Sequence, residues 1–467
     1  LMPLQRITMS PPPNVDDGGR PPVTGRDPGP KTSIDGVEDP GARAPAPAAQ
    51  DASPVSEDAG KPFERDPTVV PTVCRPECKL PEGMMHSSIA CIDGACQMAC
   101  QEGYADCDGD LDNGCEADLE DHCGPCASMP GLRKTLTVDG TAVGEDMGDF
   151  VALIALDDSD LESASDSGHD LCFTDSDGNA LAFEIDAWDQ EARHLRAWVK
   201  LPALAAGQAT SLHMYFADGR ETDRSDAEAV WASDYVGVWH LSDTRDSVAA
   251  LVGEASMATP GPGYIGRGYD FDGDEGYIEF DQAELDNAFR GGATVEAWIR
   301  PRDWGENSFG RIVTKARTTE SHDGWGLYVC NNPITRSTLC FAYDELGPLP
   351  DEWAAPHESL SLDTWQHVAV TYEPLVDLVP RMYVNGYEVP VITIDNARMG
   401  ENDDADHPLR IGNHSHESVR TFDGTIDELR ISRHVRDPAW ITTQFANQAE
   451  NGTFITVGAA QPVPQTD

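Results

Sequence analysis

A dense run of acidic side chains in YADCDGDLDNGCEADLEDHCGPC, residues 104–126, carries the clearest chemistry in this sequence. Carboxylates recur at every second position and end on a glutamate: Asp106, Asp108, Asp110, Asp112 and Glu116. Calcium takes about six to eight hard oxygen ligands, so this cluster predicts a calcium-binding loop. The run is not an EF-hand, because the turn glycine and the twelfth-position glutamate of that motif are missing. The alternative is that these side chains only solvate a small disulfide-rich fold.

The cysteines point to an exported protein. Nine of the twelve lie between Cys74 and Cys126, a density typical of oxidising, extracytoplasmic compartments. The spacings of Cys74 to Cys78 and Cys123 to Cys126 also occur in zinc sites, but export favours disulfides. Nine is an odd number, so one cysteine pairs elsewhere or stays free, and Cys172 is the candidate partner.

The segment 104–126 resembles two known patterns. It is similar to the calcium loops of thrombospondin type 3 repeats. It also resembles a cysteine-rich motif, DCDGD followed by NGCE and CGxC, that is common in myxobacterial secreted proteins. Both resemblances imply an extracellular spacer.

A second acidic motif, EIDAWD at residues 184–189, is close to the E-x-D-x-x-E strand of laminarinase-type glycoside hydrolases. Such enzymes need two carboxylates on one strand face, and Glu184 and Asp186 satisfy that alternation. The final glutamate is replaced by Asp189, however, and a motif without its structural context is weak. We interpret this segment as a solvated strand face that ends in a turn.

One carboxylate falls on the apolar face of a predicted strand. In GTIDELRIS, Asp427 alternates in phase with Leu429 and Ile431, so strict alternation points all three toward the core. A buried carboxylate without a partner costs several kcal/mol, so Asp427 needs a cation or several hydrogen-bond donors. The alternative is a hydrogen-bonded aspartate at a strand end, paired with Arg410 or Arg430.

Composition divides the 467 residues into unequal parts. Residues 1–73 are rich in Pro, Gly, Ala and Asp, which predicts a disordered stalk, and residues 74–130 form the cysteine-rich segment. The formal charge of −50 argues against nucleic-acid binding and favours cations as partners. No apolar run approaches the length of a membrane span, and no signal peptide is visible at the first residues.

Residues 131–230 alternate between short period-2 segments and turn residues, which predicts an all-β sandwich. The runs DLCFTDSDGNALAFEIDAWD, LRAWVKLP, LHMYFADG and VWASDYVGVWHL resemble an uncharacterised bacterial domain that precedes laminin-G-like domains. The resemblance implies a fold and a domain context but no chemistry.

Residues 231–458 resemble the laminin-G-like, concanavalin A-like jelly roll, with a disordered tail expected at 459–467. The segments that carry the resemblance are VGVWHLSDTRDS, GYDFDGDEGYIEFD, TVEAWIRP, TWQHVAVTYE, RMYVNGYEV and FDGTIDELRISRHVRDPAWI. Asn385-Gly386 predicts a type I′ hairpin turn, and Asp437-Pro438 predicts the start of a short closing helix. Cys330 and Cys340 flank a loop between two strand-like runs, which predicts a disulfide.

The jelly-roll resemblance also implies sites. Related domains hold a structural calcium near the strand of Asp427 and an early Asp-Ser turn, which here begins at Asp246. Ligands of this fold bind on a sheet face or at rim loops, where aromatic rings stack on sugars. The candidate rings in or near loops are those of Trp304, Trp325, Tyr343 and Trp353.

The sequence therefore predicts two consecutive β-sandwiches after a stalk and a cysteine-rich segment. The predicted function is that of a secreted or cell-surface, noncatalytic protein, lectin-like or adhesive, that recognises carbohydrate or a surface protein with calcium as a structural ion. One alternative is a structural module of an envelope or extracellular assembly. A glycoside hydrolase that acts on β-glucans is a weaker alternative, because no nucleophile–base signature is present.

Overall fold

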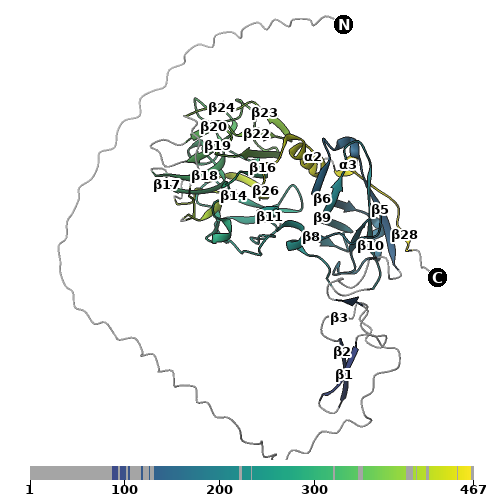
Figure 1. Ribbon diagram of the computed structural model, residues 1–467. Coiled ribbons are helices and arrows are strands. Elements are labelled where there is room, and N and C mark those ends of the chain that lie inside the picture. Colours follow the sequence, from purple (N-terminus) through teal and green to yellow (C-terminus); the bar gives the residue numbers. More distant parts are fainter. Residues whose placement is uncertain are drawn as a thin grey trace, which may run out of the picture. The chain divides into compact units, whose positions relative to one another are not determined.

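The chain divides into residues 1–70, all of which lie outside the described residues, and a second unit, residues 71–467. The computed structural model describes four short strands between residues 87 and 118, Cys126, and residues 131–463 except for short gaps (Figure 1). The gaps are 220–222, 233, 319–320, 345–350, 396–402, 406, 417–419 and 450. The predicted stalk at 1–73 lies outside the described residues.

Two small antiparallel hairpins are described in the cysteine-rich segment. Strand β1 (Ser87–Ile92) pairs with β2 (Ala95–Cys100), and β3 (Tyr104–Ala105) pairs with β4 (Ala117–Asp118). The second hairpin therefore brackets the acidic run, whose carboxylates themselves lie outside the described residues.

A first sandwich follows, as the alternating pattern predicted. Among the described residues one sheet has the order β27-β5-β10-β7, with β28 also on β5, and the other has the order β6-β9-β8. Its strands are β5 (Leu132–Val138), β6 (Met147–Asp157), β7 (Cys172–Asp175), β8 (Phe183–Asp189), β9 (His194–Leu204), β10 (Thr210–Phe216), β27 (Ile455–Val457) and β28 (Gln461–Pro462).

Strand β6 explains why FVALIAL has no polar face. Phe150 and Ile154 pack in the core of this sandwich, whereas Val151 and Leu153 belong to a second cluster with Val238 of the following domain. Both faces of the strand are covered, so both are apolar. The continuous apolar run FVALIAL therefore corresponds to a strand that packs on its own core with one face and on the other domain with the second face.

The end of the chain returns to this first sandwich. Strands β27 and β28 both pair with β5, so residues 455–462 complete the sheet of the first domain. These residues do not belong to the jelly roll or to a disordered tail, as the boundary at 458 and the tail at 459–467 predicted, while residues 464–467 lie outside the described residues. The last described strands extend a sheet whose other strands lie between residues 132 and 216, so the second domain is connected to the first at both of its ends.

The second sandwich is the jelly roll. In the described chain its first sheet has the order β13-β14-β26-β16-β21-β22-β23 with β11 beside β26, and its second sheet has the order β12-β15-β25-β17-β18-β19-β20-β24. The first sheet comprises β11 (Tyr235–Trp239), β13 (Thr259–Pro262), β14 (Arg267–Asp272), β16 (Ala293–Pro301), β21 (Gln366–Tyr372), β22 (Arg381–Val384), β23 (Tyr387–Val389) and β26 (Asp423–Ser432). The second comprises β12 (Glu254–Ser256), β15 (Tyr277–Phe280), β17 (Arg311–Thr318), β18 (Ser321–Cys330), β19 (Thr338–Asp344), β20 (Asp351–Ala354), β24 (Ile392–Thr393) and β25 (Leu409–Ile411).

The expected register is present in the jelly roll. Val295, Ala297 and Ile299 of β16 lie in the core between the sheets. Asn385 and Gly386 join β22 to β23 with φ values of 51° and 77°, the positive pair that a type I′ turn requires.

Helix α2 (Pro438–Ala449) lies between the two sandwiches (Figure 1). Its first turn is capped by Asp437, whose Oδ1 accepts the N–H of Trp440 at 2.7 Å. Trp440 packs in the core cluster of the first sandwich, while Phe445 stacks on Trp298 of the jelly roll. The helix thus covers the outer face of the first jelly-roll sheet.

The remaining helices are short. They are α1 (Ala227–Trp231), α3 (Asn451–Phe454) and the 3-10 turns at Gly140–Ala142, Ser159–Ser163, Ala283–Leu285 and Glu306–Ser308. Among the described residues, no helix is both long enough and apolar enough to cross a membrane.

Candidate functional site

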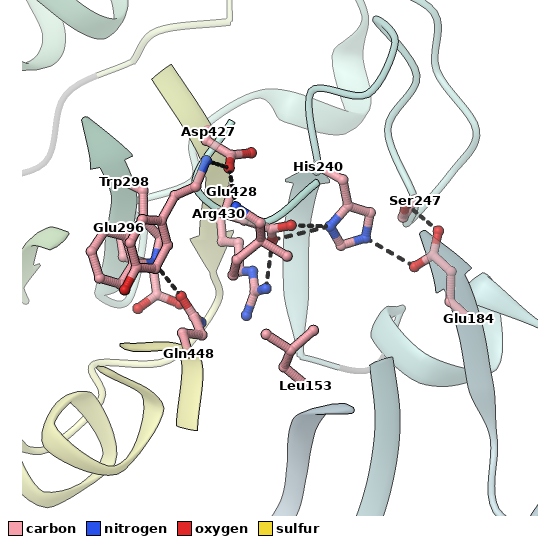
Figure 2. A network of polar contacts seen from close by, with 12 residues as sticks. Leu153, Glu184, His240, Ser247, Glu296, Trp298, Asp427, Glu428, Arg430 and Gln448 are labelled. Carbon is pink, nitrogen blue, oxygen red and sulfur yellow. Dashed lines mark hydrogen bonds and ion pairs between the residues drawn. The ribbon is translucent and has the colours of Figure 1, made fainter. Parts of the chain in front are cut away.

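The two sandwiches share a buried ionic network that centres on His240, the residue after β11 (Figure 2). Its Nε2 lies 3.1 Å from Oε2 of Glu184 on β8, and its Nδ1 lies 3.0 Å from Oε1 of Glu428 on β26. Each ring nitrogen faces a carboxylate oxygen, so both nitrogens donate and the imidazole is protonated. Burial works against this charge, but the two glutamates raise the pKa of His240 well above its usual value.

Trp198 of β9, in the first sandwich, contacts both cations of this network, His240 and Arg430. Its ring stacks on His240 at 5.6 Å, with an interplanar angle of 11°. The guanidinium carbon of Arg430 lies 4.0 Å from the same ring, and Nη2 of Arg430 donates to Glu428 at 2.6 Å. Cation–π contacts and a buried ion pair therefore link the two domains.

Glu184 faces this network and not solvent, so the predicted solvated strand face is wrong. Its Oε1 accepts the Ser247 hydroxyl at 2.7 Å, and its Oε2 accepts the Trp231 indole N–H at 2.5 Å. Burial alone would raise the pKa of Glu184, but the charge and hydrogen bond of His240 lower it below its usual value. Glu184 is therefore an ionised structural anion at the domain interface.

Asp186 lies beside Glu184 but has a different environment. Its Oδ2 is buried without a hydrogen-bond partner. Burial and the charges of Glu428 and Glu184 raise the pKa of Asp186 to about 7, although His240 opposes the shift. Asp189, the third residue of the hydrolase-like motif, is exposed and accepts the N–H of Ala192 at 2.8 Å. The three carboxylates do not line a common groove.

Asp427 is buried as predicted, but on the opposite face of its strand. Glu428 has a φ of 50° and lies in a bulge where the pairing of β26 with β16 shifts, so alternation breaks between Asp427 and Leu429. Leu429 points into the jelly-roll core, whereas Asp427 lies opposite Trp298 on the sheet's outer face. A bulge reverses every side chain beyond it, which strict alternation cannot reveal.

The partners of Asp427 are backbone groups. Its Oδ2 accepts the N–H groups of Tyr264 and Ile265 at 2.7 and 2.8 Å, and its Oδ1 has no hydrogen-bond partner. Burial, together with the neighbouring charges of Glu428 and Asp186, raises the pKa of Asp427 well above its usual value. The alternative of a hydrogen-bonded aspartate agrees with these contacts, although its partners are backbone N–H groups and not Arg410 or Arg430.

Asp246 is also buried, in a separate nest of donors. Its oxygens accept the N–H groups of Val238, Ala249 and Val248 at 2.9, 2.7 and 3.1 Å. Backbone N–H groups thus supply the partners of both Asp246 and Asp427, and calcium binding by these two carboxylates stays a prediction. In the described part of the chain, no group of three or more His, Cys, Asp or Glu side chains is placed to hold a metal ion.

The acidic run of the cysteine-rich segment is not described. The carboxylates of Asp106, Asp108, Asp110, Asp112 and Glu116 lie outside the described residues. A calcium loop at this position stays a prediction.

Three of the four predicted ligand-stacking rings are core residues. Trp325, Tyr343 and Trp353 are at most 1% exposed and pack between the two jelly-roll sheets. A sugar ring cannot reach them, so their assignment to a ligand surface is wrong. The sequence placed them near loops, but β18, β19 and β20 extend through these positions. Trp304 is half-buried against the same core.

Both cysteine predictions that fall on described residues are confirmed. Cys330 and Cys340 form a disulfide that joins β18 to β19. Cys126 of the cysteine-rich segment pairs with Cys172 on β7, so Cys172 is the outside partner that the odd count required. The Cys126–Cys172 disulfide links the cysteine-rich segment to the first sandwich.

The outer face of the second jelly-roll sheet carries aromatic–arginine pairs that sequence reasoning missed. The guanidinium carbon of Arg410 lies 4.0 Å from the ring centre of Tyr277, and that of Arg420 lies 5.3 Å from the ring centre of Phe309. Both rings are half-buried, unlike the three core aromatics. The sequence signal was weak, because each pair joins residues more than 100 positions apart.

Comparisons with known proteins agree with the two domain resemblances. Residues 272–442 match the family model of the Concanavalin A-like lectin/glucanases superfamily, and residues 167–248 match a Domain of unknown function (DUF2341). The C-terminal part is thus a concanavalin A-like jelly roll that follows an uncharacterised domain. No curated protein matches the sequence.

Solved structures with partial similarity include three bacterial domains. The binding domain of Paraclostridial mosquitocidal protein 1 has a TM-score of 0.37 and 15% identity over 46% of this chain and 52% of that one. Domain 4 of a GH43 extracellular arabinanase from Geobacillus stearothermophilus, in complex with arabinotriose, has a TM-score of 0.34 and 16% identity over 44% of this chain and 96% of that one. The botulinum neurotoxin type G receptor binding domain has a TM-score of 0.34 and 12% identity over 46% and 51%. The chain thus spans about half of the first and third of these.

Proposed function

We propose that the protein is an exported, noncatalytic binding protein whose jelly roll recognises carbohydrate or a surface protein. The observation that carries this proposal is the position of Glu184. The one strand that resembles a hydrolase motif directs this carboxylate into a salt bridge with His240, 3.1 Å away, at the domain interface. A retaining glycosidase needs two carboxylates on either side of a bound sugar, and this arrangement leaves Glu184 no such role.

The outer face of the second jelly-roll sheet is the proposed recognition surface. The outer face of the first sheet is covered, because Tyr383 and Ala369 pack in the core cluster of the first sandwich. On the second sheet, Tyr277 and Phe309 are half-buried rings, and the guanidinium groups of Arg410 and Arg420 lie over one face of each. Aromatic faces stack on sugar rings, and guanidinium groups donate hydrogen bonds to hydroxyls or carboxylates.

A glycan array probed with the full chain tests this proposal. We expect binding to at least one glycan class, which Tyr277→Ala should weaken. Tyr387→Ala is the matched control, because Tyr387 is 68% exposed on the other sheet. Binding that survives Tyr277→Ala would move the site elsewhere. No glycan binding, together with capture of envelope proteins in a pull-down, would favour the structural-module alternative.

The hydrolase alternative has its own test. Cleavage of laminarin by the purified chain, abolished by Glu184→Gln, would overturn the noncatalytic assignment. Glu184→Gln also removes the salt bridge to His240, so its melting temperature is measured to show that the variant is folded at the assay temperature. Loss of cleavage by a folded variant is then due to the loss of the carboxylate.

We also propose that calcium binds the acidic run of the cysteine-rich segment as a structural ion. The support is the sequence alone: five carboxylates within eleven residues, from Asp106 to Glu116. A ligand that binds only the folded state stabilises it by mass action, so EDTA should lower a melting transition of the full chain. An unchanged melting profile, with no calcium retained after dialysis, would contradict the proposal.

A further inference from the structure

The loop between β21 and β22 exposes an unusual number of aliphatic side chains. Its sequence is EPLVDLVP, and Leu375, Val376, Leu378 and Val379 are 54%, 63%, 56% and 39% exposed. Single exposed apolar residues are common on protein surfaces, but several together mark an interaction site. Four in one short loop form such a group.

The loop is held in one shape by its own backbone. The N–H groups of Val376 and Asp377 both donate to the carbonyl of Glu373, at 3.0 and 2.8 Å. Pro374 and Pro380 are buried at its two ends and restrict φ where the loop leaves the sheet. The aliphatic side chains are therefore presented without a large ordering cost on binding.

A fifth aliphatic residue extends this surface. Val435, which follows β26, is 38% exposed. A side chain on Gly292 would lie 2.4 Å from Cγ2 of Val435 and 3.2 Å from Cβ of Glu373, so Val435 lies beside the loop. We call Leu375, Val376, Leu378, Val379 and Val435 the aliphatic tip.

Three exposed arginines surround the aliphatic tip at the same end of the sheet. Arg381 begins β22, Arg433 directly follows β26, and Arg290 lies three residues before β16. The strand ends meet there, because Thr294 of β16 pairs with both Thr371 and Ser432. In a chain with 82 acidic and 32 basic residues, this group of arginines is a local exception. Of the acidic side chains near this end, Glu373, Asp377 and Asp234 are half-buried, and Asp234 forms an ion pair with Arg436. Asp437 is exposed, but its Oδ1 accepts the N–H of Trp440 at the start of α2.

We propose that the aliphatic tip and its arginines dock onto a phospholipid bilayer that contains anionic lipid. Leucine and valine are under-represented among protein–protein hot spots, where Trp, Tyr and Arg dominate, so a purely aliphatic tip fits an acyl phase better than a protein cleft. The aliphatic tip also has few side chains compared with the about 20 to 30 residues that each partner contributes to a stable protein interface. The arginines would bind lipid phosphates while the tip enters the headgroup boundary.

This proposal does not depend on glycan binding, because the aliphatic tip and the proposed recognition surface lie on different sheets. Vesicle co-sedimentation of the full chain tests it, with phosphatidylcholine and phosphatidylglycerol at a 7:3 ratio against phosphatidylcholine alone. We expect binding to the mixed vesicles that weakens with salt. Val376→Asp should reduce vesicle binding by about tenfold or more, because it places a charge where an aliphatic side chain would enter the bilayer.

A matched control separates the tip from general surface apolarity. Ile334 is 66% exposed on a different loop, so Ile334→Asp should leave vesicle binding unchanged. Both substitutions are at exposed positions, and equal melting temperatures verify that both variants fold. Arg433→Gln combined with Arg381→Gln should lower binding to the mixed vesicles and leave any residual binding to phosphatidylcholine intact.

Three results would overturn the proposal. The first is a wild-type chain that fails to bind the mixed vesicles at millimolar lipid. The second is an equal loss of binding in Val376→Asp and Ile334→Asp. The third is concentration-dependent self-association in sedimentation velocity that Val376→Asp abolishes, which would make this surface an interface between copies of the chain.

Discussion

Replacement of Asp186 by asparagine should remove a pH-dependent penalty from the domain interface. The carboxyl of Asp186 has a buried oxygen without a partner and lies near Glu184 and Glu428, so the folded protein favours its protonated form. The unfolded chain releases that proton at its ordinary pKa of 3.8, whereas the folded chain holds it up to about 7. The folded state therefore binds more protons in this window, and the stability of the wild-type protein falls as the pH rises through it.

The size of the effect follows from the two pKa values. A difference of about 3 units at 1.36 kcal/mol each gives about 4 kcal/mol as an upper value. Asp186 is only half-buried, so screening by solvent lowers this to roughly 2 kcal/mol. For a folded unit of roughly 330 residues the unfolding entropy is about 0.7 kcal/mol per degree, so 2 to 4 kcal/mol corresponds to about 3 to 6 °C.

Calorimetry of both proteins from pH 4.5 to pH 8 measures this effect. The melting temperature of Asp186→Asn, relative to wild type, should increase steadily as the pH rises from 4.5 to 7.5. Asp189→Asn removes an exposed carboxylate from the end of the same strand and should follow the wild-type curve. Parallel curves for wild type and Asp186→Asn would refute the reasoning, because Asp186 would then be ionised in the folded state at all these pH values.

Three further predictions concern the stability of the sandwiches. Removal of the Cys126–Cys172 disulfide should cost about 4 kcal/mol and removal of Cys330–Cys340 about 3 kcal/mol, since they close loops of 46 and 10 residues. Thermal unfolding of the double-alanine variants checks this order, and a larger loss for the shorter loop would contradict it. Gly386→Ala should destabilise the protein more than Gly219→Ala, because both have a φ near +78° but only the first would place a Cβ, 2.7 Å from Phe445, against another residue. Equal melting temperatures for Gly386→Ala and Gly219→Ala would contradict this prediction, because backbone strain alone would then account for the loss of stability in both variants. Trp353→Ala should cost about 3 to 5 kcal/mol, as for other core tryptophans, and a melting temperature like that of wild type would show that the ring is not packed.

Local pattern predicted much of the fold correctly. The Asn385-Gly386 turn, the Asp437 cap and the inward face of β16 follow from backbone and side-chain chemistry that extends over a few residues. The role of Cys172 as a partner of the cysteine-rich segment followed from a count and a compartment argument, whereas the sequence did not identify Cys126 as the cysteine that it binds. Each of these predictions needed only information that is close in sequence or independent of the fold.

Predictions that depended on contact between domains, or on where strands end, were the ones that failed. The return of β27 and β28 to β5 joins residues more than 300 positions apart, and no local pattern encodes it. The burial of Trp325 and Trp353 depends on how far β18 and β20 extend, and strand ends are poorly marked in sequence.

The acidic strands β8 and β26 show why a motif and strict alternation led to wrong predictions for Glu184 and Asp427. Glu184 and Asp427 were read as one solvated and one inward-facing carboxylate, yet both face the domain interface. A polar strand face has two physical explanations, contact with water or contact with a complementary polar surface, and both give the same local sequence. The difference lies in the partners: His240 donates to Glu184 from the other domain, and the apolar strand β6 lies in the same interface. Burial of a charge without a partner of opposite sign is costly. A strand face that carries cations and anions next to apolar residues is therefore better explained by contact with another domain than by contact with water. The apolar run FVALIAL was therefore the sequence signal for the interface, and the charges of β8 and β26 were its polar complement.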